Sequence, residues 1–143
     1  MRIAAWVITL LALAGCSGTR PAPQGDVYVL RNDNGGHILS AEIDRKQLLD
    51  WGKRVEIHGY CVSSCTMFTT LPNACLMPDS RIGFHGATIS IGAGGNAQVS
   101  KYLRGEIKRR FDADWHRVPQ KQFHWVEARD YVRLDPQARL CAR

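Results

Sequence analysis

Four residues that could carry chemistry stand together in the stretch "GYCVSSCTMF", residues 59–68. The cysteines Cys61 and Cys65 enclose two serines, Ser63 and Ser64. Cysteines at this spacing can form a disulfide or contribute to a zinc site. A serine between a strand and a helix can act as a nucleophile when a neighbouring base takes its proton. The same serine can also be a simple helix cap, because serine is a preferred N-cap residue.

Histidines that could serve as the base or as metal ligands occur nearby in the chain. His85 ends the strand-like run "RIGFH", and His37 follows Gly35-Gly36 in "NDNGGHIL". A histidine at a strand end can also be a core residue, and His37 has the character of a solvated loop histidine. A metal site formed by the cysteines with His58 or His85 would lack a second close cysteine pair, so no metal is expected.

The first residues have the features of an export signal. Arg2 precedes an apolar stretch, residues 3–15, which is too short to span a bilayer comfortably. The stretch ends in "LAGC" and resembles a bacterial lipoprotein signal, which implies removal of residues 1–15 and lipidation of Cys16. An ordinary secretory signal or a membrane anchor are the alternatives. Residues 16–25 would then be a lipidated, flexible tether, and residues 26–143 the folded domain.

This signal implies localisation to the bacterial cell envelope. By resemblance to known lipoproteins, Ser17 after the lipidated cysteine favours the outer membrane over the inner, with the domain on the periplasmic face. In this oxidising compartment disulfides are expected. Four cysteines remain, which allows three pairings that the sequence leaves open: Cys61, Cys65, Cys75 and Cys141.

The charge of the chain is moderately basic. The formal net charge is +6, and removal of Arg2 with the signal leaves +5. Basic residues crowd the segment "KYLRGEIKRRFDADWHR", which could in principle contact nucleic acid or an anionic membrane. A solvated face is the simpler interpretation, and no nucleic-acid partner is expected.

The order of predicted elements is that of an α/β domain with a mainly parallel sheet. Period-two runs predict strands, and apolar residues at helical spacing predict helices. In the first helix Ser40 is the expected cap, with Ala41, Asp44 and Leu48 on one face and Gly52 at the end. Strands are predicted at residues 26–33, 54–60, 74–77 and 81–85, and helices at 40–52, 63–71, 98–115 and 125–132, with residues 86–96 as a loop.

Three pieces of the chain resemble a known family in their order and spacing. These are "NDNGGHIL", "CVSSCTMF" and "MPDSRIGFH". They are similar to the glycine-rich turn, the nucleophile turn and the histidine-bearing strand of the Clp protease proteolytic subunit and its crotonase-like relatives. A group of predicted periplasmic Clp-like proteins is the most similar. The resemblance covers residues 27–86 well and the rest loosely, and it implies a single crotonase-like domain with short helices.

The resemblance implies a role for each matching position. Ser63 takes the place of the nucleophile and His85 that of the general base. The backbone N–H groups of Gly36 and Ser64 take the place of the oxyanion hole. Were the register shifted by one residue, Ser64 would be the nucleophile. Neither a cofactor nor a metal is part of this arrangement.

One departure from the family divides two possible functions. The family has an aspartate before its last helix, where this chain has Gln120 or Lys121. Without an orienting carboxylate a serine–histidine pair loses several orders of magnitude in rate. The resemblance therefore leads to two expectations: a lipid-anchored serine hydrolase, acting as a peptidase on a peptide or protein, or a non-catalytic lipoprotein that binds a peptide or envelope component. Relatives often form rings or trimers, so a homo-oligomer is a further expectation.

Overall fold

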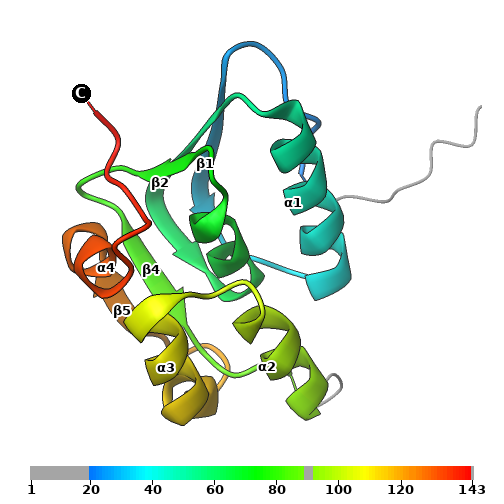
Figure 1. The fold of residues 1–143 in the computed structure, drawn as a ribbon. Coiled ribbons are helices and arrows are strands. Elements are labelled where there is room, and N and C mark those ends of the chain that lie inside the picture. Colours follow the sequence, from blue (N-terminus) through cyan, green and yellow to red (C-terminus); the bar gives the residue numbers. More distant parts are fainter. Residues whose placement is uncertain (1–19, 89–91, 143) are drawn as a thin grey trace, which may run out of the picture.

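A computed structural model of the chain describes residues 20–88 and 92–142. The domain is mixed α/β, as the sequence predicts, and its sheet is mostly parallel (Figure 1). The strands are β1 (Val27–Asp33), β2 (Arg54–Val62), β3 (Ala74–Leu76), β4 (Arg81–Phe84) and β5 (His124–Glu127). The helices are α1 (Ile38–Trp51), α2 (Gly92–Ser100), α3 (Gly105–Ala113) and α4 (Ala128–Leu134), with 3₁₀ helices η1 (Ser63–Thr70) and η2 (Trp115–Arg117). Within the described residues, no helix is both long and apolar enough to cross a membrane.

The long strand β2 is the centre of the sheet. β1 pairs with one edge of β2, and β3 and β4 pair end to end with the other, all in parallel. β5 joins β4 in antiparallel pairing. Parallel strands need crossover connections, and α1 and η1 provide the first two. The carboxyl end of β1, that of β2 and the end of β4 therefore come close together at one end of the sheet.

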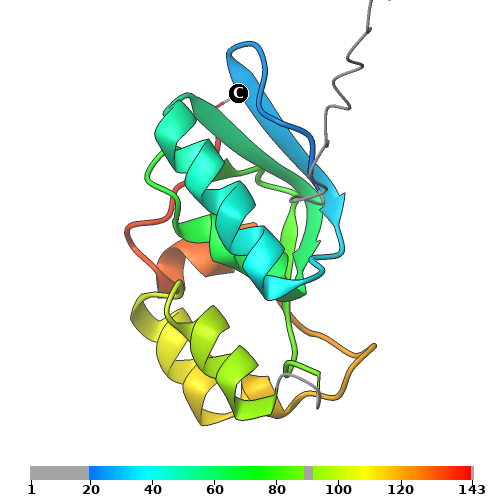
Figure 2. The same cartoon turned by 90° about the vertical axis from the view of Figure 1, so that its right-hand side faces the viewer.

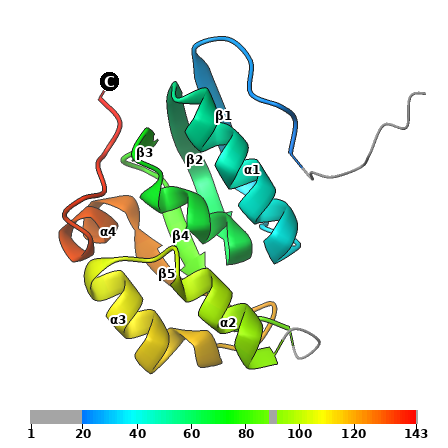
Figure 3. The same cartoon turned by 45° about the vertical axis from the view of Figure 1, so that its right-hand side comes forward.

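The helices cover one face of the sheet. The views in Figures 1 and 2 place α1, α2 and α3 on the same side of the strands. The burial of β1 and β2 alternates accordingly: Tyr28 and Leu30 are buried, as are Val55 and Ile57, while Val29 is 43% exposed. Figure 3 shows η1 beside β3, within the same layer as α1. Side chains of η1 fill the core there, because Met67 and Phe68 have no exposed surface.

The first helix begins earlier than predicted. Its N-cap is His37, which makes no side-chain capping bond, so the expected capping role of Ser40 is wrong. Because the helix begins at Ile38, Ser40 is already its third residue and lies past the cap position. The predicted end is correct, since Gly52 has a left-handed φ of 71° at the C-cap.

The single helix predicted over residues 98–115 is two helices. α2 begins at Gly92, inside the expected loop, and the chain turns before α3 begins at Gly105. Gly105 has a φ of 55°, and a Cβ there would lie 2.7 Å from the Leu134 carbonyl oxygen. The end of α4 therefore lies directly against the backbone at the start of α3, a contact that the periodicity of apolar residues cannot reveal.

The last predicted helix was placed too early. Residues 124–127 form β5 and the helix begins only at Ala128. Trp125 and Val126 pair with Gly83 and Ile82 of β4. A Cβ on Gly83 would lie 2.9 Å from the Trp125 ring, so the missing side chain makes room for this pairing. The pairing partner is distant in sequence, which is why local pattern favoured a helix.

All four domain cysteines form disulfides, which confirms the expected use of cysteine. Cys61 bonds to Cys65 across the start of η1, and Cys75 of β3 bonds to Cys141 in the C-terminal tail. The tail also pairs with β3 through the Leu76 amide, which donates to the Arg139 carbonyl at 2.9 Å. The second disulfide therefore closes the domain between residues 66 positions apart.

Candidate functional site

Ser63 stands in a strained conformation where β2 becomes η1. Its φ is +58°, in the left-handed region that non-glycine residues rarely adopt. The N-cap of η1 is Val62, and no side-chain capping bond is present there. The interpretation of Ser63 as a helix cap is therefore wrong. Strain of this kind persists where the surroundings fix it, and it concentrates at functional sites.

The glycine turn lies directly against Ser63. Gly35 and Gly36 both have positive φ, 80° and 121°. A Cβ on Gly35 would stand 2.7 Å from the Ser63 Cβ and 2.8 Å from the Ser64 amide nitrogen. Only glycine permits this approach. A Cβ on Gly36 would meet nothing within 4 Å, so this residue faces open space beside the serine.

His85 follows β4 and completes the group. Its ring is partly buried and makes an edge contact with Phe123, with 5.3 Å between ring centroids. Burial lowers the pKa of His85 below that of free histidine, and the polar backbone of Gly86 opposes this only in part. The imidazole is therefore neutral near pH 7, the form that a general base requires.

A pocket brings the three pieces together. It has a volume of about 590 Å³, and Gly36, Ser63 and His85 all line it. Its other lining residues are Asn34, His37, Ile38, Val62, Ala87, Thr88, Gln120, Lys121 and Phe123. His37, which the sequence suggested only as a solvated loop residue, is exposed and also lines this pocket. Four segments distant in sequence thus share one wall, at the end of the sheet where β1, β2 and β4 finish.

Ser64 has a different environment from Ser63. It is 1% exposed and does not line the pocket, and its Oγ has no hydrogen-bond partner among the described residues. Its side chain points into the protein interior, whereas its amide lies next to Gly35. This geometry fits a backbone role for Ser64 and a side-chain role for Ser63.

An orienting acid for His85 is not found in the described structure. Nδ1 of His85 is buried and has no hydrogen-bond partner there, and the pocket wall contains no Asp or Glu. The candidate position is occupied by Gln120 and Lys121, which both line the pocket. Two carboxylates near this segment in sequence serve elsewhere: Asp112 accepts from Lys108 at 2.8 Å, and Asp130 accepts from Arg133.

A metal at the cysteine pair is incompatible with the observed bonding. The sulfurs of Cys61 and Cys65 are joined to each other and cannot act as thiolate ligands. The disulfide encloses Ser63 and Ser64 in a ring with the strand end. It holds the two halves of the strand-to-helix turn together. The predicted lipidation site Cys16 lies outside the described residues.

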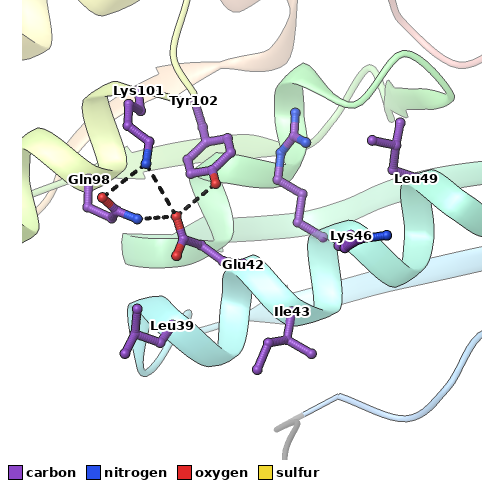
Figure 4. Close-up of a pocket in the computed structure, with 9 residues that line it drawn as sticks. Leu39, Glu42, Ile43, Lys46, Leu49, Gln98, Lys101 and Tyr102 are labelled. Atoms are coloured by element: carbon purple, nitrogen blue, oxygen red, sulfur yellow. Dashed lines mark hydrogen bonds and ion pairs between the residues drawn. The ribbon is translucent and has the colours of Figure 1, made fainter.

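A second groove, of about 620 Å³, lies between α1 and the end of α2 (Figure 4). Its polar side chains pair with one another: the Tyr102 hydroxyl donates to Glu42 at 2.7 Å, and Lys101 donates to Gln98 at 3.2 Å. Gln98 also donates to Glu42. None of Gly36, Ser63 and His85 lines this groove. The pocket at Ser63 is therefore the candidate site.

Sequence reasoning missed a group of buried charges behind the site. Arg20, which was assigned to a flexible tether, bonds to Asp33 at 2.7 Å and to Asp44 at 3.0 Å. The signal was present: Asp44 occurs at the same helical spacing as the buried Ala41 and Leu48. A charge on the buried face of a helix requires a partner.

Comparisons with known proteins do not assign the chain to a family. No family model matches it, and no curated protein matches it. The Clp-like resemblance therefore rests on the three sequence motifs alone.

Proposed function

We propose that the chain is a serine hydrolase of the Clp-protease and crotonase-like type, acting as a peptidase through Ser63 and His85. The single observation that carries the proposal is the left-handed φ of +58° at Ser63, a serine at a strand-to-helix junction on the wall shared with His85. A strained junction of this kind exposes a serine hydroxyl to a bound substrate. We also propose that the α/β fold is a single crotonase-like or Clp-protease-like domain, shorter than a full Clp subunit.

The mechanism follows from the placement of the groups. Ser63 Oγ attacks the carbonyl carbon while His85 accepts the hydroxyl proton. The N–H groups of Gly36 and Ser64 stabilise the oxyanion, each such donor being worth about 3 kcal/mol in the transition state. His85 then gives its proton to the leaving amine. Water, activated by the same histidine, releases the acid and restores Ser63.

The Ser–His pair has no direct hydrogen bond in the described structure. Catalytic hydrogen bonds are often long in ligand-free proteins and tighten around a substrate. The unpartnered Nδ1 of His85 is the greater limitation. We expect slow turnover, because the imidazolium formed during attack has no carboxylate beside it.

The same pocket, which lacks an orienting acid for His85, supports a second candidate function. A pocket with an apolar wall and a neutral histidine could bind a peptide or envelope component without cleaving it. His85 and Ser63 would then contact the ligand from the pocket wall. The two candidates differ in one property, which is whether Ser63 becomes acylated.

We further propose that the protein is held at the bacterial outer membrane through lipidated Cys16, with self-association into a small ring as a secondary expectation. Only Ser17, Gly18 and Thr19 separate Cys16 from Arg20, which is fixed in the domain. Four residues of extended chain reach about 14 Å. Substrates of this pocket would accordingly be peptides close to the membrane surface.

Hydrolysis of p-nitrophenyl butyrate tests the proposal. The mature protein with its disulfides formed should release a burst of nitrophenol equal to its own concentration, because acylation of Ser63 precedes slow deacylation. Ser63→Ala should abolish the burst and Ser64→Ala should leave most of it. Wild-type protein that shows no burst, while folded by circular dichroism, would support the binding function instead.

A further inference from the structure

A buried ionic cluster lies behind the glycine turn. The Arg20 guanidinium donates to both oxygens of Asp33, at 2.7 and 2.8 Å, and to Asp44 of α1 at 3.0 Å. The side chains are 8%, 14% and 4% exposed. Charged groups are buried only when they are paired, so this cluster fixes three segments to one another: the chain before β1, the end of β1 and α1.

The cluster also holds both backbone polar groups of Gly35. Arg20 Nη2 donates to the Gly35 carbonyl at 3.2 Å. The Gly35 amide donates to Asp33 Oδ1 at 2.7 Å, the same oxygen that accepts from Arg20. These hydrogen bonds hold the Gly35 backbone in one conformation, which matters because a glycine without such partners has access to many.

Arg20 touches the serine side of the site as well. Its guanidinium lies over the ring of Phe68, with 4.6 Å between the guanidinium carbon and the ring centroid. Phe68 belongs to η1, the helix that Ser63 begins, and it is fully buried. One side chain thus contacts the turn that offers the Gly36 amide and the helix that begins with Ser63.

We propose that Arg20 is a positioning residue for the oxyanion hole. Its guanidinium holds the Gly35–Gly36 turn against Ser63, so the hole is complete only when the segment containing Arg20 is docked. The proposal rests on the hydrolase function above. Under this proposal the segment around Arg20, which is nearest to the proposed lipidation site, takes part in the reaction. It is then more than a flexible connection to the membrane.

The chain offers a matched control in Lys53. Its ammonium donates to the Gly25 carbonyl at 2.8 Å and to Asp26 at 3.0 Å, at the opposite end of β1 from the glycine turn. It is likewise a cation that binds an aspartate and a backbone carbonyl, and it ties the segment before β1 to the chain between α1 and β2. Lys53→Ala should leave acylation unchanged, because none of its contacts reaches the pocket.

The test compares Arg20→Ala, Arg20→Lys and Lys53→Ala in ester acylation, with hydrogen exchange of the Gly35 amide as a second readout. We expect Arg20→Ala to slow acylation at saturating ester at least tenfold, with KM changed less than threefold. We also expect Gly35 exchange to accelerate at least tenfold. Arg20→Lys should recover part of both effects, and millimolar methylguanidinium should partly restore Arg20→Ala.

The outcomes separate this proposal from the hydrolase function. A wild-type protein without acylation refutes the hydrolase, while Gly35 exchange still reports whether Arg20 holds the turn. A folded Arg20→Ala protein with wild-type acylation and exchange overturns the positioning role. Should Arg20→Ala fail to fold, Arg20→Lys decides: unchanged acylation and exchange would overturn the proposal, and slower acylation with faster exchange would support it.

Discussion

The backbone of Gly35 lies so close to Ser63 that a Cβ on the glycine would stand 2.7 Å from the serine Cβ. The same added atom would be 2.7 Å from the Val62 carbonyl and 2.8 Å from the Ser64 amide. Atoms at these distances must move apart. The glycine turn and the serine turn can therefore lie this close only because residue 35 has no side chain.

Gly35→Ala should lower the acylation rate of Ser63 by about 100-fold, because a displacement near 1 Å at a reacting group has this effect. Gly25→Ala is the matched control. Gly25 also has a left-handed φ, 70°, but a Cβ there meets nothing within 4 Å. Both variants should lose about 1–2 kcal/mol of unfolding free energy from backbone strain, and Gly35→Ala should lose more because its Cβ also displaces the serine turn. Equal acylation rates in the two variants would show that the contact with Ser63 is unimportant.

The pH dependence of acylation should follow His85. Because burial lowers its pKa from 6.5, the neutral base persists below that value, and acylation should decline only at lower pH. Stopped-flow ester kinetics across the acid range would measure this decline. His85→Gln should remove both the activity and the pH dependence. A rate that already halves above pH 6.5 contradicts the burial argument.

The same lowered pKa affects stability. The unfolded chain takes up a proton at His85 near pH 6.5, whereas the folded chain does so only at lower pH. The unfolded state therefore binds more protons in this interval, and the contribution of His85 to stability decreases as the pH falls below 6.5. Urea unfolding of wild type and His85→Gln should show a smaller pH dependence in the variant. An identical dependence in both proteins would exclude this linkage.

The two disulfides should affect different properties. Replacing Cys75 and Cys141 with alanine should cost about 2–5 kcal/mol of unfolding free energy, because this bond closes a long loop. Replacing Cys61 and Cys65, which are four positions apart, should lower the unfolding free energy less. It should lower the acylation rate more than loss of the long disulfide does, because it frees the turn around Ser63. Denaturant titration and ester kinetics on both double variants would measure this. The opposite ranking would contradict the bracing role of the short disulfide.

Supplying a carboxylate should strengthen the site. Lys121→Asp places an acid on the pocket wall, at one of the two positions where the resemblance to Clp-like proteins implies an aspartate, and aspartate tolerates the left-handed φ of 69° there. We expect a raised pKa of His85 by NMR titration and acylation about tenfold faster. Lys121→Asn, of equal shape but uncharged, is the control. Equal His85 pKa values in the two variants would show that position 121 does not reach Nδ1.

The strands and the pocket were largely predictable because their signals are local. Alternating apolar residues marked β1 and β2, and the glycines and Ser63 follow them directly. The split at Gly105 and the pairing of Trp125 with β4 were not predictable, since both depend on contacts with distant segments. The strain at Ser63 is likewise a property of packing around the turn and has no signature in the residue type.

The role of the N-terminal segment was missed for a similar reason. Residues 16–25 have the composition of a linker, and composition alone predicts flexibility. Arg20 is nevertheless ordered by Asp33 and Asp44, which come from two later elements. A single buried cation can thus turn a linker-like sequence into part of a site.

Covalent labelling with a fluorophosphonate, followed by mass spectrometry of the labelled peptide, tests the central claim most directly. The folded, oxidised protein should carry one adduct, located on Ser63, and the unfolded protein and Ser63→Ala should carry none. An adduct on Ser64 would contradict the assignment of the nucleophile. The absence of any adduct on a demonstrably folded protein would contradict an activated serine and leave ligand binding as the function of this pocket.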